Sequence, residues 1–279
     1  MKLALRHVFL LVVVVFALFP IVFVVSAALN PLGTLSSSQL IPSGVSLHNV
    51  AELFSSDRYP FARWFFNSVF IALVSSFASL LLSLFAAYAF SRMRFAGRRV
   101  GLLALLLIQM FPQFLAIVAI FMIFTRVTEL YPAFGFDTVW GLLLLYLGGA
   151  LGVNTWLMKG FLDTVPKELD ESATVDGASH VQIFWKIILP LVTPILAVTA
   201  LLAFIGIMNE FILANVFLKD ADAKTLAVGM FGMIAGDRRN ENFGMFAVAT
   251  LITAVPTVGV FMWLQKYIVS GLTAGAVKG

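Results

Sequence analysis

The sequence predicts an all-α integral membrane protein with six transmembrane helices, and two observations carry this prediction. Hydrophobic residues make up 61% of the 279 residues and charged residues only 11%, whereas soluble globular domains hold about 25% charged residues. In addition, six apolar runs are each long enough to cross the roughly 30 Å hydrocarbon core of a bilayer. The expected spans are residues 8–29, 64–91, 100–125, 138–158, 187–218 and 242–265, within a single transmembrane domain that covers residues 1–279.

The first run has an alternative interpretation as a cleavable signal peptide. It follows Lys2 and Arg6 and ends near Val25-Ser26-Ala27, which is the order of segments in a signal peptide. However, its uncharged stretch is longer than the 7 to 15 or so residues of a signal-peptide core. We therefore expect a retained first span.

Basic residues indicate how the chain is oriented in the membrane. Arg92, Arg94, Arg98 and Arg99 lie in the short connection between the second and third runs. Because short cytoplasmic loops are enriched in Lys and Arg, this connection is expected to be cytoplasmic. With six spans, both termini and residues 160–189 then lie on the cytoplasmic side as well.

Several classes of function are excluded by what the sequence lacks. The chain has no cysteine and only three scattered histidines, so neither a disulfide nor a metal site is predicted. It has no G-x-x-x-x-G-K-[ST] loop for ATP, and no cluster of His, Asp or Glu within the spans that would suggest an intramembrane enzyme. The basic residues fit membrane orientation, not nucleic-acid binding. We predict no catalytic residue.

Residues 160–189 predict a helical hairpin outside the lipid. Pro166 suits the first position of a helix, and Gly177 ends that helix. Ser179 and Gln182 match a capping box at the start of a second helix. The following residues share one apolar helix face, namely Val181, Phe184, Trp185 and Ile188. This face either docks on a partner protein or lies on the membrane surface.

The same segment resembles the signature of a known family. Glu171-Ser172-Ala173, three residues, Gly177, nine residues, Ile187, one residue and Leu189-Pro190 follow the E-A-A-x3-G-x9-I-x-L-P pattern, with Ser172 as the one departure. This pattern is typical of permease subunits of binding-protein-dependent ABC importers. The resemblance implies a type I ABC importer permease fold in which the hairpin is a cytoplasmic coupling helix that docks on an ATPase subunit. The coupling residues that it implies are Glu171, Ser172, Ala173, Gly177, Ile187, Leu189 and Pro190.

Other segments resemble the MalG-type permeases of maltose/maltodextrin importers, namely residues 88–95, 109–112, 146–149, 225–230 and 271–279. This resemblance implies import of maltose or maltodextrins in the bacterial inner (cytoplasmic) membrane. The implied partners are a second and different permease, two copies of a cytoplasmic ATPase subunit, and a periplasmic or extracellular sugar-binding protein. No cofactor is implied on this chain, because ATP and Mg would be bound by the ATPase subunits.

Two more sets of site residues follow from this resemblance. The outer loop of residues 219–241 is expected to be long and irregular and to reach the binding protein through Thr225, Gly229, Gly232 and Gly236. The cytoplasmic tail of residues 271–279 is expected to enter the ATPase interface through Gly271, Thr273, Gly275 and Lys278.

Glu210 is the acidic residue that falls within an apolar run. Since intramembrane charges usually face a cavity or a partner, Glu210, Asn209 and Gln109 are candidate cavity or gate residues. The alternative is that Glu210 lies at the outer interface and is solvated there. Pro112, Pro194 and Pro256 are expected to bend their helices.

Two alternatives for the function stay open. Within the same class, the substrate is another oligosaccharide, such as trehalose, or a glycerol-linked compound, and transport competition separates these cases. In a different class, the chain is a self-contained secondary carrier or channel. That function predicts dependence on an ion gradient and no ATPase partner.

Overall fold

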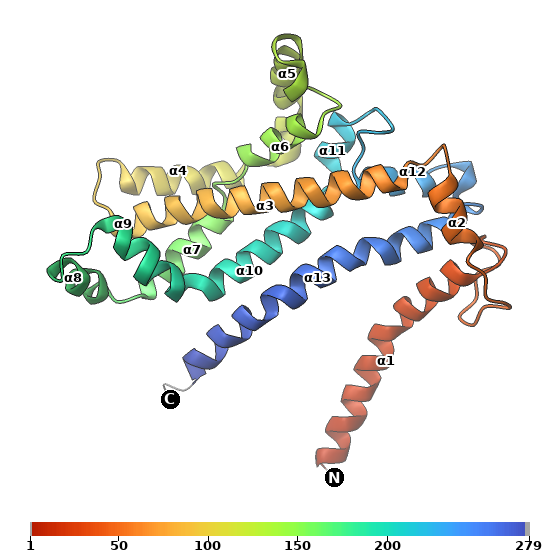
Figure 1. Ribbon diagram of the computed structural model, residues 1–279, viewed down its shortest axis with the longest axis horizontal. Helices are drawn as coiled ribbons and strands as arrows, with labels where there is room; N and C mark the ends of the chain where they lie inside the picture. Colours follow the sequence, from red (N-terminus) through yellow and green to blue (C-terminus); the bar gives the residue numbers. More distant parts are fainter. Residues whose placement is uncertain (1, 277–279) are drawn as a thin grey trace. The chain divides into compact units, whose positions relative to one another are not determined.

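The computed structural model describes residues 2–276 (Figure 1), and no β-strand occurs among them. The all-α fold predicted from composition is therefore confirmed. The α-helices are α1 (Lys2–Leu29), α2 (His48–Ser55), α3 (Phe61–Arg92), α4 (Arg98–Met110), α5 (Gln113–Leu130), α6 (Val139–Gly148), α7 (Val153–Thr164), α8 (Glu168–Val175), α9 (His180–Ile183), α10 (Leu189–Met208), α11 (Ile212–Phe217), α12 (Leu226–Ile234) and α13 (Phe243–Ala276).

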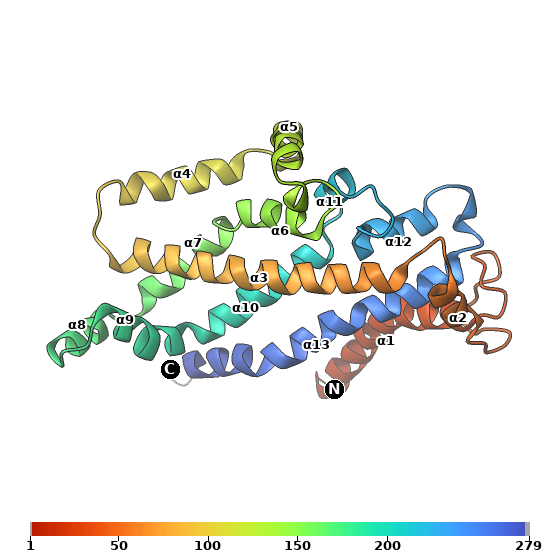
Figure 2. The ribbon, with the colours of Figure 1, turned by 45° about the horizontal axis from the view of Figure 1, so that its top comes forward.

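The six apolar runs fall on six helical segments, four of them long and apolar enough to cross a membrane as one helix. These four are Leu5–Leu29, Phe61–Arg92, His180–Phe217 and Phe243–Val269. The other two runs are bent pairs: α4 and α5 meet at 100°, and α6 and α7 meet at 49° (Figure 2). The sequence located the runs and predicted the bend at Pro112 in the third run, but it did not show that the fourth run is broken.

The breaks have local causes. Pro112 is the N-cap of α5 and has no backbone N–H, so it cannot continue the hydrogen-bond ladder of α4. Gly148 is the last residue of α6, and Gly149 and Gly152 lie in the connection to α7; glycine weakens a helix through its backbone entropy. Pro194 and Pro256 lie inside α10 and α13 without ending either helix.

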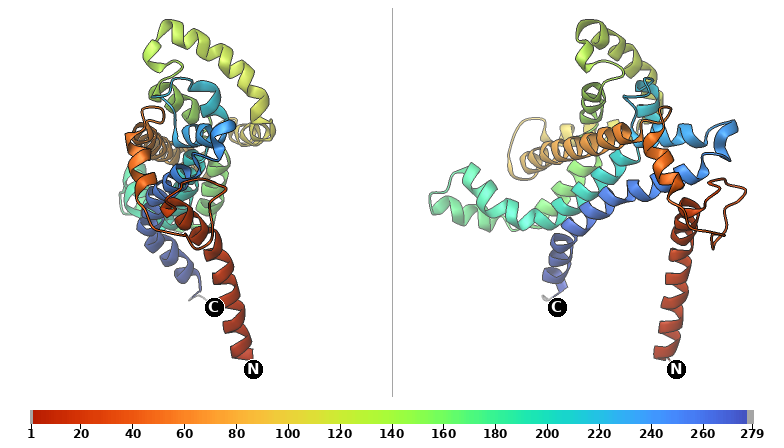
Figure 3. Two further views of the ribbon diagram at one scale, coloured as in Figure 1. Left: turned by 90° about the vertical axis from the view of Figure 1, so that its right-hand side faces the viewer. Right: turned by 45° about the vertical axis from the view of Figure 1, so that its right-hand side comes forward.

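The chain divides into two compact units, of which the first comprises Met1–Ser68 and Leu218–Pro256. In this unit, most of α1 is exposed apolar surface, and Figure 3 shows it as one long rod. The segment after α1 is held by amide side chains, since Asn49 Nδ2 donates to the carbonyls of Ala28 and Asn30 at 2.9 Å each. Asn242 similarly donates to Met233 O at 2.8 Å.

The outer segment of residues 219–241, which also lies in the first unit, is not the irregular loop that we expected. It contains α12 and a 3-10 turn at Asp237–Arg239. Leu226, Val228 and Met233 are buried, so α12 has an apolar face to pack. The burial of these apolar side chains explains why the segment is helical although it is rich in glycine.

The second unit comprises Val69–Phe217 and Thr257–Gly279 and contains the hairpin. Helices α8 and α9 form this hairpin (Figure 1). A buried apolar cluster joins it to α3 and α7, and its members include Leu84, Tyr88, Met158, Leu162, Ala173, Ile183, Phe184 and Ile188.

Two details of the predicted hairpin were wrong. The first helix begins at Glu168, two residues after Pro166. The second is not a separate surface helix, because α9 passes through a π-helical segment at Phe184–Ile188 into α10. Its apolar face is divided: Phe184 and Ile188 are buried inside the chain, whereas Val181 and Trp185 are exposed.

Candidate functional site

The turn of the hairpin is built by backbone chemistry. After α8, Gly177 has a φ of +83°, the left-handed conformation that glycine adopts without steric cost. Gly177 N donates to Thr174 O at 3.0 Å, and Ala178 N donates to Ala173 O at 2.9 Å. These two bonds form a Schellman motif, which satisfies carbonyls at the end of α8. The predicted helix stop at Gly177 is confirmed.

The second helix of the hairpin starts at the predicted capping box. Ser179 N donates to Gln182 Oε1 at 2.8 Å, and Gln182 N donates to Ser179 Oγ at 3.3 Å. The Schellman motif ends at Ala178, and the capping box begins at the next residue, Ser179. Together they fix α8 relative to α9 without a long flexible loop.

The predicted coupling residues point in different directions. Glu171, Ser172, Gly177 and Pro190 are exposed, whereas Ala173 is buried in the cluster that joins the hairpin to α3 and α7. Ile187 and Leu189 pack at the edge of the same cluster. The set thus combines an outward surface with the residues that anchor it.

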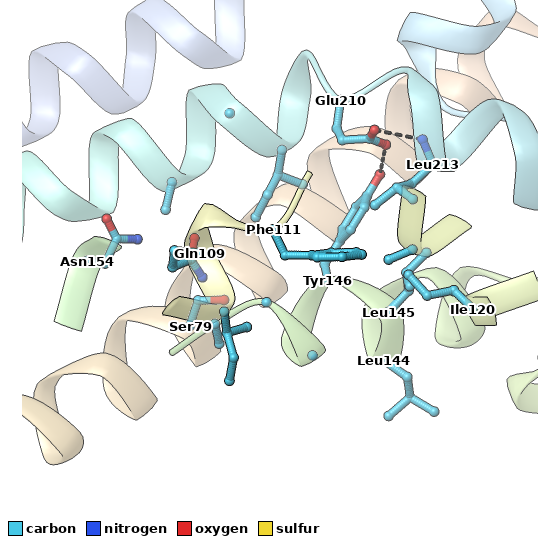
Figure 4. A pocket seen from close by; sticks show the side chains of 18 of the residues that line it. Ser79, Gln109, Phe111, Ile120, Leu144, Leu145, Tyr146, Asn154, Glu210 and Leu213 are labelled. Atoms are coloured by element: carbon cyan, nitrogen blue, oxygen red, sulfur yellow. Dashed lines mark hydrogen bonds between the residues drawn. The ribbon is translucent and has the colours of Figure 1, made fainter. Parts of the chain in front are cut away.

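The second unit also contains a cavity of about 990 Å³, which is mostly apolar (Figure 4). Side chains from α3 to α7 and α10 line it, together with residues of the α10–α11 connection. Its polar lining residues include Ser79, Gln109, Tyr146, Asn154 and Glu210. A cavity of this size with few polar groups is typical of a site for an organic ligand.

Glu210 lies in the break between α10 and α11, and its carboxylate is fully engaged. Oε1 accepts a hydrogen bond from Leu213 N at 2.8 Å. Oε2 accepts from Ala214 N at 2.9 Å and from the Tyr146 hydroxyl at 2.7 Å (Figure 4). Glu210 therefore caps α11 and ties it to α6 at the wall of the cavity.

The other two candidate cavity residues differ in position. Gln109 lines the cavity and lies against Gly152, where an added Cβ would come within 2.6 Å of Gln109 Nε2. Asn209 is not among the lining residues, because its amide folds back onto Ile205 O at 2.8 Å. Sequence reasoning missed the role of Tyr146 as the partner of Glu210, although its hydroxyl within an apolar run was a signal.

Only some of the residues predicted to contact a binding protein are exposed in the outer segment of residues 219–241. Thr225 is buried at the start of α12, and Gly229 lies under the ring of Trp64. Trp64 itself donates from Nε1 to Ala221 O at 2.7 Å. Gly232 and Gly236 are exposed. Thr225 and Gly229 therefore have packing roles here, and contact with a binding protein stays a prediction for the exposed pair.

The C-terminal residues continue a helix. Gly271, Thr273 and Gly275 belong to α13, which runs to Ala276. Their predicted contact with the ATPase interface stays a prediction. Lys278 lies outside the described residues. Within residues 2–276, His, Asp and Glu nowhere gather into a group of three that would hold a metal ion.

Comparison with known proteins identifies the family. Residues 79–274 match the family described as "Binding-protein-dependent transport system inner membrane component". The chain belongs to this family. It is therefore a multi-pass permease, and the resemblance drawn from the hairpin signature is confirmed.

Relatives of this permease align over its whole length. The galactooligosaccharides transport system permease protein GanQ of Bacillus subtilis (strain 168) is 38% identical over 279 residues, covering 100% of this chain and 96% of GanQ. The maltose/maltodextrin transport system permease protein MalG of Escherichia coli (strain K12) is 37% identical over 289 residues, covering 100% of this chain and 96% of MalG. A solved bacterial ABC transporter involved in the import of alginate shares the fold, with a TM-score of 0.77 over 95% of each chain at 22% identity.

Proposed function

We propose that this permease forms half of the translocation pathway of an ATP-driven oligosaccharide importer. Its partners are a second, different permease, two copies of an ATPase subunit and an extracytoplasmic sugar-binding protein. The observation that carries this proposal is the hairpin, because it presents an exposed signature surface on a rigid support and continues directly into the membrane helix α10.

The mechanism follows from the continuity of the elements. The chain has no ATP-binding loop of its own, so energy must arrive from partner subunits that hold ATP and Mg. A partner that moves α8 would move α9 and α10 as one body, since no flexible loop separates α9 from α10. Rigid-body rocking of such helices opens a central cavity to one side of the membrane at a time.

The proposed orientation places the hairpin and both termini in the cytoplasm of a bacterial cell. Arg92, Arg94, Arg98 and Arg99, which lie in the α3–α4 connection and at the helix ends beside it, support it through the positive-inside rule. The outer segment with α12 then faces the binding protein, and its exposed Gly232 and Gly236 are the positions best placed for contact.

For the substrate we propose maltose or maltodextrins first. The full-length relationship to MalG supports this choice, together with the tail and the 225–230 stretch. The relationship to GanQ is equally extensive and makes galactooligosaccharides the second candidate. Competition of unlabelled maltodextrins, galactooligosaccharides and trehalose against labelled maltose uptake separates these substrates. Failure of every maltodextrin to compete or be transported would remove the first choice.

The importer itself is tested by co-purification of the tagged chain from its native membrane in mild detergent. Mass spectrometry should find a second multi-span permease and an ATPase with the wild-type chain. The Glu171→Lys variant should lose the ATPase, because it reverses an exposed charge of the signature. Glu168→Lys is the matched control, since Glu168 is also an exposed acid of α8 but lies outside the signature. Recovery of the chain alone, with uptake that follows an ion gradient, would replace this proposal with a secondary carrier.

A further inference from the structure

A buried ion pair joins the hairpin to a second membrane helix. Arg92 is the last residue of α3, and Asp170 lies in the first turn of α8. Arg92 Nε lies 2.8 Å from Asp170 Oδ2, and the two side chains are only 6% and 20% exposed. Arg92 Nη2 also donates to Val165 O at 2.8 Å, in the connection between α7 and α8.

Among the ion pairs of residues 2–276, this is the one in which both side chains are largely buried, since the partly buried Lys159 pairs with an Asp163 that is 43% exposed. Arg126 and Glu129, for example, are 79% and 54% exposed, and such solvated pairs contribute little to stability. Taking two charges out of water is costly, and removing one partner of a buried pair strands the other. Arg94 is exposed in the same connection as Arg92, so membrane orientation alone does not require a buried arginine.

Neighbouring contacts hold the same end of α3. Ser91 Oγ donates to Asp163 Oδ1 at 2.7 Å, which ties α3 to α7. The rings of Tyr88 and Phe184 pack edge to face with their centroids 4.9 Å apart, which ties α3 to the π-helical segment. The Arg92–Asp170 pair adds a direct polar tie between α3 and α8, the helix that carries Glu171.

The pair is also built to pivot. Arg92 Nε, Arg92 Nη1 and Asp170 Oδ1 are buried and have no hydrogen-bond partner within the described part of the chain, so the 2.8 Å contact of Nε with Asp170 Oδ2 is an ion pair without hydrogen-bond geometry. The two side chains therefore meet at one ion-pair contact, while two guanidinium nitrogens and one carboxylate oxygen make no hydrogen bond. A carboxylate can slide along a guanidinium edge to a two-point contact, so α8 can tilt while the charges stay paired.

We propose that the Arg92–Asp170 pair is a second mechanical joint between the coupling hairpin and the membrane domain. It rests on the proposed function, since it takes α8 as the place where the ATPase acts. The first joint is the continuous path from α9 into α10. The second makes α3 follow α8, so both helices move when the ATPase closes. Arg92 and Asp170 are positioning residues and contact neither sugar nor nucleotide.

The test measures ATP hydrolysis and sugar uptake separately, in proteoliposomes that contain the whole transporter. Arg92→Gln and Asp170→Asn remove one charge each and should lower the sugar transported per ATP by about threefold or more, the scale of a broken coupling contact. The exchanged variant, Arg92→Asp with Asp170→Arg, should recover part of the ratio. Arg94→Gln, in the same connection, should keep the wild-type ratio.

The outcomes separate this inference from the proposed function. Absence of ATP-driven uptake by the wild-type transporter refutes the proposed function and, with it, the joint. Wild-type uptake with parallel loss of ATPase and uptake in the variants overturns the joint alone, because it shows a structural role only. If the single-charge variants fail to accumulate, Arg92→Lys and the exchanged variant carry the test, because both keep opposite charges at positions 92 and 170. Arg92→Lys should keep most of the sugar transported per ATP and the exchanged variant part of it; loss of that ratio in both variants, at normal ATP hydrolysis, overturns the joint.

Discussion

At the scale of the residue, the two most informative side-chain environments are those of Gly177 and Glu210. Both were singled out from sequence, Gly177 by its spacing and Glu210 by its charge. The structure gives each a physical task. Gly177 has a positive φ in a Schellman motif, and Glu210 closes three hydrogen bonds at a break in a membrane helix.

Replacement of Gly177 tests the backbone of the hairpin. Nothing in this chain lies within 4 Å of a Cβ added at this position, so within the chain the cost of a side chain comes from the positive φ. A β-branched residue in the left-handed region is destabilised by about 1–2 kcal/mol. Gly177→Val should therefore reduce ATP-driven uptake while the protein still inserts, whereas Gly177→Asn should retain most of it. Uptake by Gly177→Val at the wild-type rate and expression level would contradict the role of the turn.

Removal of the Tyr146 hydroxyl tests the tie between α6 and α11. Tyr146→Phe deletes one hydrogen bond to the Glu210 carboxylate, and a bond of this kind is worth about 1.5–3 kcal/mol. The two backbone bonds by which Glu210 caps α11 stay in place. Thermal unfolding in detergent should begin at a lower temperature, and uptake should fall. Asn209→Ala is the control, because the Asn209 amide bonds to Ile205 O beside the cavity and not within its lining. Equal behaviour of the two variants would argue against a role for the Tyr146–Glu210 bond.

At the scale of the element, the apolar runs that were predicted as single spans form helices that are either bent or extended. The third and fourth runs broke at Pro112 and at a glycine group, whereas α9 and α10 merged. The outer segment folded into α12 because its apolar residues found partners within the first unit. The breaks have local causes in Pro112 and the glycine group, whereas the merging of α9 with α10 and the folding of α12 depend on packing that a run of residue types does not specify.

Two glycines of α12 provide a matched test of that packing. A Cβ at Gly229 would clash with the ring of Trp64, whereas a Cβ at Gly232 would meet nothing within 4 Å. Gly229→Ala should destabilise the protein by about 1–3 kcal/mol through overpacking, while Gly232→Ala should be neutral or slightly stabilising. Thermal unfolding of the two purified variants gives the comparison. A larger loss for Gly232→Ala would show that α12 does not pack on Trp64.

At the scale of the whole molecule, the membrane topology sets the roles of the two exposed regions. In the proposed importer, the hairpin faces an ATPase subunit and the α12 segment faces the binding protein. Because the chain has no native cysteine, single cysteines can report each side without background. Val175 is 88% exposed on the hairpin, and Asp237 is exposed in the 3-10 turn after α12.

Labelling with a membrane-impermeant maleimide tests the topology. Asp237→Cys should react in intact spheroplasts, and Val175→Cys should react only after the membrane is permeabilised. Both variants should react fully in detergent, which controls for burial. The reverse pattern would invert the orientation and place the signature surface outside the cell, away from any ATPase.

Much of this protein was determined by its sequence alone. Composition and run length determined the all-α membrane fold, because a bilayer leaves few structures that satisfy every backbone group. The hairpin turn was equally predictable, since Gly177 and the Ser179–Gln182 box act through local hydrogen bonds. Glu210 stood out because a charge within an apolar run is costly wherever it lies.

Only the tertiary structure decided which partners these residues have. It paired Arg92 with Asp170 and Glu210 with Tyr146, and it turned Gly229 toward Trp64. These contacts join residues far apart in the chain, and their energies depend on burial and on distances of a few ångströms. A single sequence records neither quantity, because the same residue types are compatible with many arrangements of the same helices.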